Sequence, residues 1–223
     1  MTSISKTTLD FLAALKENNN RDWFTEHKTE FQQEQKKAKI FYNAVMEKLK
    51  MHDEIESVKI FRIYRDVRFS PDKTPYKHHF AGNFVRATNK LRGGYYLRIR
   101  PGESFLAGGF WEPNKEDLLR IRKEFEMDAS EIREILSNPT FVTYFGKLEG
   151  DALKTAPRGF DKEHPDMDLI RMKQFIVTRK FTDDEVLAPN FLQEVNESYK
   201  AMRPYFNYMS DVLTTDLNGV SIL

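Results

Sequence analysis

The sequence predicts an α+β fold in which a central antiparallel or mixed sheet is flanked by helices. Three observations support this prediction: strand-like alternation is concentrated in the middle of the chain, helix-like periodicity lies on both sides of it, and strands do not alternate regularly with helices. No internal repeat and no Ser/Gly-rich linker divides the 223 residues, so we expect a single domain over residues 1–223.

Composition indicates the class of protein. Hydrophobic residues make up 40% of the chain, which is enough to build a core, and charged residues make up 31%, which predicts a strongly solvated surface. No apolar run approaches the roughly 20 residues of a membrane span, and the N-terminal residues lack a signal-peptide pattern. We therefore expect a cytoplasmic protein without membrane contact. The absence of cysteine excludes disulfides and thiolate chemistry, and we expect neither a metal site nor a cofactor.

Two helices are expected before the first strand. The first begins after Thr7 or Thr8, whose hydroxyls can accept hydrogen bonds from the free amides of the first turn, and it ends at Asn18–Asn20. The second covers residues 22–51, which contain neither glycine nor proline. Its apolar residues recur on one face, so we expect this helix to pack on the sheet.

Two strands and a turn follow. Residues 58–65 alternate between two faces, each of which carries apolar groups and ends in an arginine, Arg62 on one face and Arg65 on the other. Residues 70–73 predict a turn because they place a proline before an aspartate. Residues 76–86 are expected to form the return strand.

A hairpin is expected at residues 94–111, with its turn at residues 101–103. Tyr96, Arg98 and Arg100 fall on one face of its first strand, which is therefore cationic on that side. Gly108–Gly109 in the second strand indicates either a bulge or a close approach by another backbone or a ligand.

Helix starts and stops mark the C-terminal half. Three short helices are expected after residue 114, then an irregular stretch at residues 148–161, a short helix, a strand at residues 174–181 and one or two helices over residues 190–213. The signals for these elements are the capping residues Asn114, Asp128, Asn138 and Thr182, the stop at Gly146, the helix opening at His164–Pro165, and the helix break at Pro204.

The strongest functional signal is a cluster of bases. Between Phe61 and Phe80 the chain carries five lysines and arginines against two aspartates, a local charge of +3. Convergent guanidinium groups bind phosphate or carboxylate with charge-assisted hydrogen bonds. We therefore predict an anion pocket whose binding residues are Arg62, Arg65, Arg68, Lys73, Arg98 and Arg179, with Tyr96 and Trp111 as its walls.

Two other interpretations of this cluster stay open. Arg62 and Arg65 can instead pair with Asp66, Asp72, Glu103 or acidic residues of the helices in a network that only stabilises the fold. The interleaved aromatic residues also fit the stacking of bases in single-stranded nucleic acid.

Several kinds of site are disfavoured by the sequence. Lys73–Thr74 lacks the glycines of a phosphate loop, and no serine stands in a G-x-S-x-G context. His78 and His79 are neighbours on an extended segment, so their side chains point to opposite faces and do not share one metal. No spacing enforces a pair of catalytic carboxylates. The sequence therefore assigns no catalytic residue and no reaction.

The chain resembles a family of bacterial proteins. The strings that carry the resemblance are FRIYRDVRFSPDKTPYK, GYYLRIRPG, GGFW, FGKLEGDALKTAPRGFDKEHPD and FIVTRKFTDDEVL, in that order. They are similar to the family called domain of unknown function 2461, and the similarity covers about residues 8–213. The resemblance implies a single α+β domain and brings no activity, cofactor or catalytic residue.

The sequence thus predicts a cytoplasmic protein that binds a small ligand bearing phosphate or carboxylate. The alternative is a non-catalytic module that binds nucleic acid or a protein partner through the same basic surface. The sequence assigns no oligomeric state.

Overall fold

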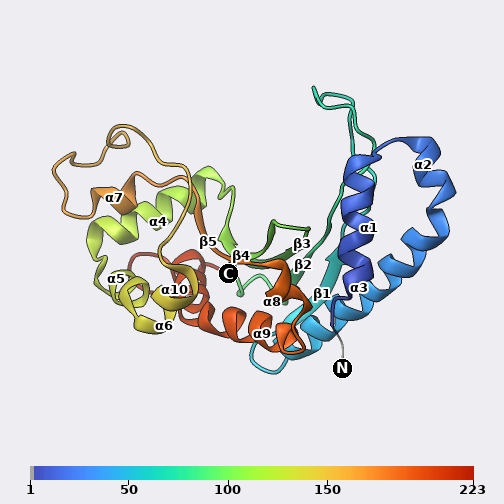
Figure 1. The fold of residues 1–223 in the computed structure, drawn as a ribbon. Helices are drawn as coiled ribbons and strands as arrows, with labels where there is room; N and C mark the ends of the chain where they lie inside the picture. Colours follow the sequence, from blue (N-terminus) through green and yellow to red (C-terminus); the bar gives the residue numbers. More distant parts are fainter. Residues whose placement is uncertain (1–2) are drawn as a thin grey trace. The chain divides into compact units, whose positions relative to one another are not determined.

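The computed structural model describes residues 3–223 and has an α+β fold. Within these residues the strands form a five-stranded antiparallel sheet in the order β1-β2-β3-β4-β5 (Figure 1). The strands are β1 (Ile55–Ile60), β2 (Phe80–Arg86), β3 (Gly94–Ile99), β4 (Ser104–Phe110) and β5 (Phe175–Phe181). The predicted fold class is therefore confirmed.

The chain divides into two compact units. The first unit takes the described residues up to Val85 together with Tyr96–Leu106 and Lys180–Glu197, and the second takes Arg86–Tyr95, Ala107–Arg179 and Ser198–Leu223. A boundary between the two units falls inside each of the strands β2, β3, β4 and β5. The expectation of a single domain stays a prediction.

The first unit begins with α1 (Lys6–Glu17), α2 (Arg21–Glu26) and α3 (Lys28–Leu49). The single helix expected over residues 22–51 is wrong, because the helix is interrupted at His27. The His27 ring stacks on Trp23, with ring centroids 3.9 Å apart, and its Nδ1 donates to the Trp23 carbonyl at 2.8 Å. The Trp23 carbonyl also accepts from the His27 backbone N–H at 3.0 Å, and a new helix begins one residue later, at Lys28.

The core of the first unit lies between α3 and the sheet (Figure 1). The buried Tyr42 hydroxyl contacts two strands, at 3.1 Å from the carbonyls of both Phe80 and Leu97. Phe41 stacks on Phe191 of α9 (Phe191–Ala201) at a centroid distance of 5.4 Å. The capping box predicted at Thr182–Glu185 is confirmed and opens α8 (Asp183–Leu187).

Residues 61–80 continue past β1 and β2 as a narrow projection, which we call the arm (Figure 1). Its two sides are joined by backbone hydrogen bonds from Phe61 to Ala81, from Lys77 to Ile63 and from Arg65 to Pro75. The strands expected at residues 58–65 and 76–86 correspond to β1 and β2, but the expected bounds were wrong where they extend into the arm. The regular ladder stops at Ile60 and restarts at Phe80, and beyond it the pairing continues only as an isolated antiparallel bridge between Tyr64 and Tyr76.

The second unit contains α4 (Lys115–Met127), α5 (Ser130–Ser137), α6 (Pro139–Phe145), α7 (Met167–Ile170) and α10 (Arg203–Thr214). Asn114 and Asn138 cap α4 and α6 as predicted. Asp128 stands one residue before the N-cap of α5, yet its carboxylate still accepts from the Ser130 amide at 2.8 Å. Pro204 lies in the first turn of α10, so it separates the last two helices.

Gly109 shows why a glycine is needed in β4. Its φ is +130°, and a Cβ there would overlap the carbonyl oxygen of Phe175 in β5. Of the two explanations considered for Gly108–Gly109, this is the close approach of another backbone.

Among the described residues, no helix combines the length and apolarity needed to cross a membrane.

Candidate anion-binding site

One side of β3 carries the polar and aromatic groups that the alternation predicts. Tyr95, Leu97 and Ile99 are buried, whereas Tyr96 and Arg98 are half-buried on the other side. Further half-buried side chains of the first unit gather around these two. Together they form what we call the basic aromatic face: Phe61, Lys77, His79, Tyr96, Arg98, Arg100 and Phe105.

The aromatic rings form a row on this face. Tyr96 lies 6.4 Å from Phe61 and 5.4 Å from Phe105, measured between ring centroids. The Lys77 ammonium lies 5.5 Å from the Phe61 centroid, and the Arg98 guanidinium carbon lies 4.3 Å from the Phe105 centroid. Both cations are thus held over aromatic rings, which attract positive charge through their faces.

Arg98 and Arg100 are incompletely neutralised. Glu103 lies 2.9 Å from Arg100 and 3.5 Å from Arg98, so one half-exposed carboxylate serves two guanidinium groups. Arg98 also donates to the Glu103 carbonyl at 3.2 Å. Its Nε is buried and has no hydrogen-bond acceptor among the described residues. Most buried polar atoms in proteins have a partner, so this donor is unusual.

The pKa of His79 reports the same positive environment. This pKa falls from 6.5 to about 4, first because of burial and then, in order of size, because of Arg98, Lys77, His78 and Arg100. Burial also lowers the pKa of Lys77, with a smaller contribution from Arg62. The leading electrostatic contributions at His79 all come from cations or histidines, so the face attracts negative charge.

The other basic residues predicted for the site in this unit lie on the arm. Arg65 contacts Asp72 and Thr74 and donates to Ser70 at 3.3 Å, and these contacts tie the arm's tip together. The Asp72 pKa falls to about 2, because Thr74 and then Arg65 donate to its carboxylate.

Arg68, Lys73 and Arg62 complete the arm's bases. Arg68 is exposed and pairs with Asp66 at 2.6 Å, and Lys73 donates to the Val67 carbonyl at 3.0 Å. Arg62 is exposed and makes no ion pair within residues 3–223. The structural network considered from the sequence thus engages Arg65 and Arg68.

Arg179 and Trp111 belong to the second unit. Arg179 donates to Ser198 at 2.7 Å and lies 5.0 Å from the centroid of the Tyr144 ring. Trp111 is 65% exposed.

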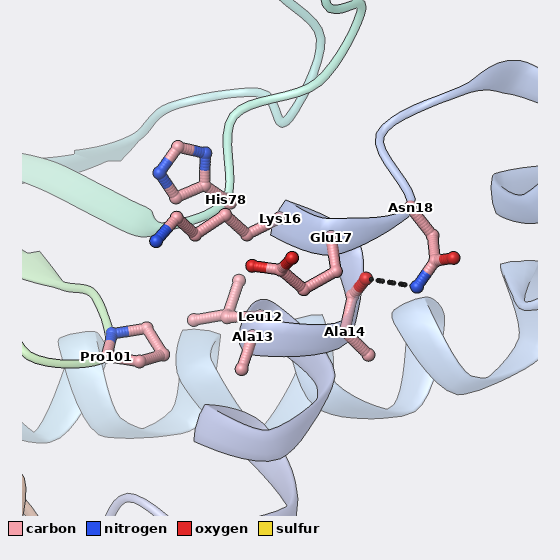
Figure 2. Close-up of a pocket in the computed structure, with 8 residues that line it drawn as sticks. All are labelled: Leu12, Ala13, Ala14, Lys16, Glu17, Asn18, His78 and Pro101. Carbon is pink, nitrogen blue, oxygen red and sulfur yellow. Dashed lines mark hydrogen bonds between the residues drawn. The ribbon is translucent and has the colours of Figure 1, made fainter.

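A cavity of about 380 Å³ lies beside the C-terminal half of α1 (Figure 2). Its lining includes Leu12, Lys16 and Glu17 of α1 together with His78 and Pro101. The charges of the basic aromatic face lower the pKa of His79, whereas His78 lines this cavity. Neighbouring side chains on an extended segment are expected to point to opposite faces in this way. Figure 2 shows the Lys16 side chain beside the His78 ring and the Glu17 carboxylate turned toward Leu12.

Sequence reasoning missed several residues of the basic aromatic face. Arg100 could have been included, because it follows Tyr96 and Arg98 in the same alternation. Lys77, His79 and Phe61 come from the base of the arm, and their place beside β3 depends on strand pairing. No local signal in the sequence specifies that pairing.

The comparisons with known proteins agree with the resemblance in the sequence. A family model described as conserved hypothetical protein (DUF2461) matches residues 7–208. Neither the comparison with curated proteins nor that with solved structures found a match. Since the family model covers most of its length, the chain belongs to the conserved hypothetical protein family DUF2461.

Proposed function

We propose that this protein is cytoplasmic and binds a small ligand bearing phosphate or carboxylate on the basic aromatic face, with Arg98 as the central contact. The observation that carries the proposal is the state of the Arg98 guanidinium. It shares one carboxylate with Arg100 and keeps a buried Nε without an acceptor among the described residues. A guanidinium binds planar or tetrahedral oxyanions through two parallel hydrogen bonds.

The neighbouring groups have distinct tasks in this proposal. Lys77 and Arg100 add positive charge, and Tyr96 supplies an aromatic wall, as predicted from the sequence. His79 is neutral at pH 7, because its pKa is about 4, so it can offer a hydrogen bond without a charge. The proposal concerns binding and assigns no reaction.

Salt dependence separates this ligand class from the alternative, a nucleic acid or protein bound through the same basic surface. A polyanion releases many counterions on binding and loses affinity steeply as salt rises. A small anion held by half-buried groups loses less, because such groups are screened less by salt.

The experiment is a thermal-shift comparison of wild type and Arg98→Gln with phosphate, sulfate and dicarboxylates at low and moderate salt. A ligand at 100 times its dissociation constant stabilises the fold by about 2.7 kcal/mol, or about 5–10 °C at this chain length. Arg158→Gln is the matched control, because Arg158 is exposed and outside the face. The proposal fails if no anion shifts the wild type, or if Arg98→Gln shifts as much as wild type.

A further inference from the structure

The arm exposes an aromatic residue. Phe69 near its tip is 95% exposed, and Tyr64 on one of its sides is 50% exposed. A phenylalanine left in water forgoes about 1.5–3 kcal/mol of burial free energy. Phe69 therefore contributes little to the core, and its position on the arm needs another explanation.

The arm is ordered internally. Arg65 reaches Asp72, Thr74 and Ser70 across the turn. The Lys73 ammonium donates to the Val67 carbonyl from the other side of the tip. Phe69 is thus presented on a turn fixed by its neighbours, and ordering such a turn on binding costs little further entropy.

Positive charge accompanies the exposed ring. The arm carries five bases against two aspartates. Both aspartates are already engaged, Asp66 by Arg68 and Asp72 by Arg65. The Arg68 guanidinium carbon lies 6.0 Å from the Phe69 centroid, so a cation stands directly beside the exposed ring.

The arm is continuous with the basic aromatic face. Phe61 begins one side of the arm and is also the first ring of the aromatic row. An extended strand advances about 3.3 Å per residue, so Phe61 and Arg65 are separated by about 13 Å along the arm. Cations and rings therefore follow one another over a length that exceeds a single small anion.

We infer that, in addition to the small anion held by the basic aromatic face, the protein binds a single-stranded nucleic acid whose terminal phosphate occupies that site and whose next nucleotides lie along the arm. Phe69 provides a stacking platform for a base, and Arg62 and Arg68 contact phosphates. This inference rests on the proposed function, because it takes Arg98 as the first phosphate site. Alternating rings and cations along a track are typical of single-strand binding that tolerates many sequences.

The first experiment measures length dependence by fluorescence polarisation, with labelled oligouridylates of 2, 4, 8 and 12 nucleotides and with unlabelled uridine monophosphate as competitor. We expect affinity to rise from 2 to 8 nucleotides. Phe69→Ala should weaken binding of the 8-mer about 5- to 100-fold, the range found when a stacking aromatic is removed. Met51→Ala is the control, an exposed apolar side chain outside the arm and the basic aromatic face, and should leave binding unchanged.

The mononucleotide separates this inference from the proposed function. Arg98→Gln should abolish uridine monophosphate competition, whereas Phe69→Ala should leave it unchanged. If the monophosphate binds and longer oligomers bind no tighter, the inference is overturned and the proposed function stands. If neither binds, the inference is overturned, and the thermal-shift comparison with small anions decides the proposed function separately.

A second experiment counts phosphate contacts from the salt dependence of the 8-mer. For single strands the slope of log affinity against log salt is about −0.7 per phosphate neutralised. Arg62→Gln should flatten the slope by about 0.7, whereas Lys36→Gln on the exposed side of α3 should not. An unchanged slope in Arg62→Gln would overturn the arm's role. The arm's role would also be overturned if the protein bound anionic vesicles or an acidic peptide through Phe69 and did not bind the oligomer.

Discussion

Replacement of His79 with glutamine tests the electrostatics of the basic aromatic face. In the folded protein the His79 pKa is about 4, and its ordinary value is 6.5. Between these two values the unfolded chain binds a proton that the folded chain does not. The free energy of unfolding therefore falls as the pH falls from 6.5 toward 4.

The size of this effect follows from the two pKa values. Proton linkage between them removes about 2 kcal/mol of stability when the pH changes from 7 to 5. His79 is only half-buried, so solvent screening reduces the expected loss to about 1 kcal/mol. The glutamine variant has no proton to gain at this position and should lack that part of the loss.

The assay is urea unfolding of wild type, His79→Gln and the control His27→Gln at pH 7 and pH 5. His27→Gln serves as the control because it replaces a histidine outside the basic aromatic face, at the break between α2 and α3. Sulfate adds a second test, because its charge stays at −2 between pH 7 and pH 5. An anion bound on the face favours the imidazolium form of His79. Sulfate should therefore reduce the stability that the wild type loses between pH 7 and pH 5. Equal pH dependence of wild type and His79→Gln would refute the electrostatic argument.

Two further predictions concern the arm and the sheet. Arg65→Ala removes the contacts to Asp72, Thr74 and Ser70. Trypsin should therefore cleave after Arg68 or Lys73 faster than in wild type or Arg158→Ala, and global stability should fall by about 1 kcal/mol. An unchanged cleavage rate would contradict the role of Arg65. Gly109→Ala places a methyl group against the Phe175 carbonyl in a left-handed conformation and should lower the free energy of unfolding in urea by more than about 3 kcal/mol. Gly102→Ala meets no atom within 4 Å at φ +70° and should lower it by only about 1 kcal/mol. Equal losses in the two variants would show that the contact with Phe175 is unimportant.

Elements with local signals could be predicted from the sequence. The capping side chain of Asn114, the box at Thr182–Glu185 and the hairpin around Gly102 each depend on residues close together in the chain. Local side chain to backbone hydrogen bonds and turn preferences decide such features. They were therefore placed within a residue or two of the observed bounds.

Features that depend on tertiary contacts could not be predicted. The helix break at His27, where the ring stacks on Trp23, is not revealed by any periodicity in the sequence. The alternation of residues 58–65 continues to Arg65, yet regular pairing stops at Ile60, because hydrogen bonding depends on what the opposite side offers.

The residues of the candidate site also divide into those that local alternation predicts and those that only tertiary contacts bring together. Tyr96 and Arg98 were placed on one face by alternation, which is local. Their association with Lys77 and His79 requires the pairing of the arm's base with the sheet. The part played by Arg65 was left open between two interpretations, because sequence spacing does not say which carboxylate a guanidinium meets.

The interleaved path of the chain affects how the protein is made on the ribosome. The first unit is complete only when Lys180–Glu197 has been synthesised, 112 residues after Val85. At about 5–20 residues per second, this delay lasts roughly 6–22 s. During that time the nascent chain exposes apolar faces of α3 and β2 whose later partners, such as Phe191, do not yet exist. Synthesis of this protein therefore passes through an interval in which chaperones that bind nascent chains find an exposed hydrophobic target.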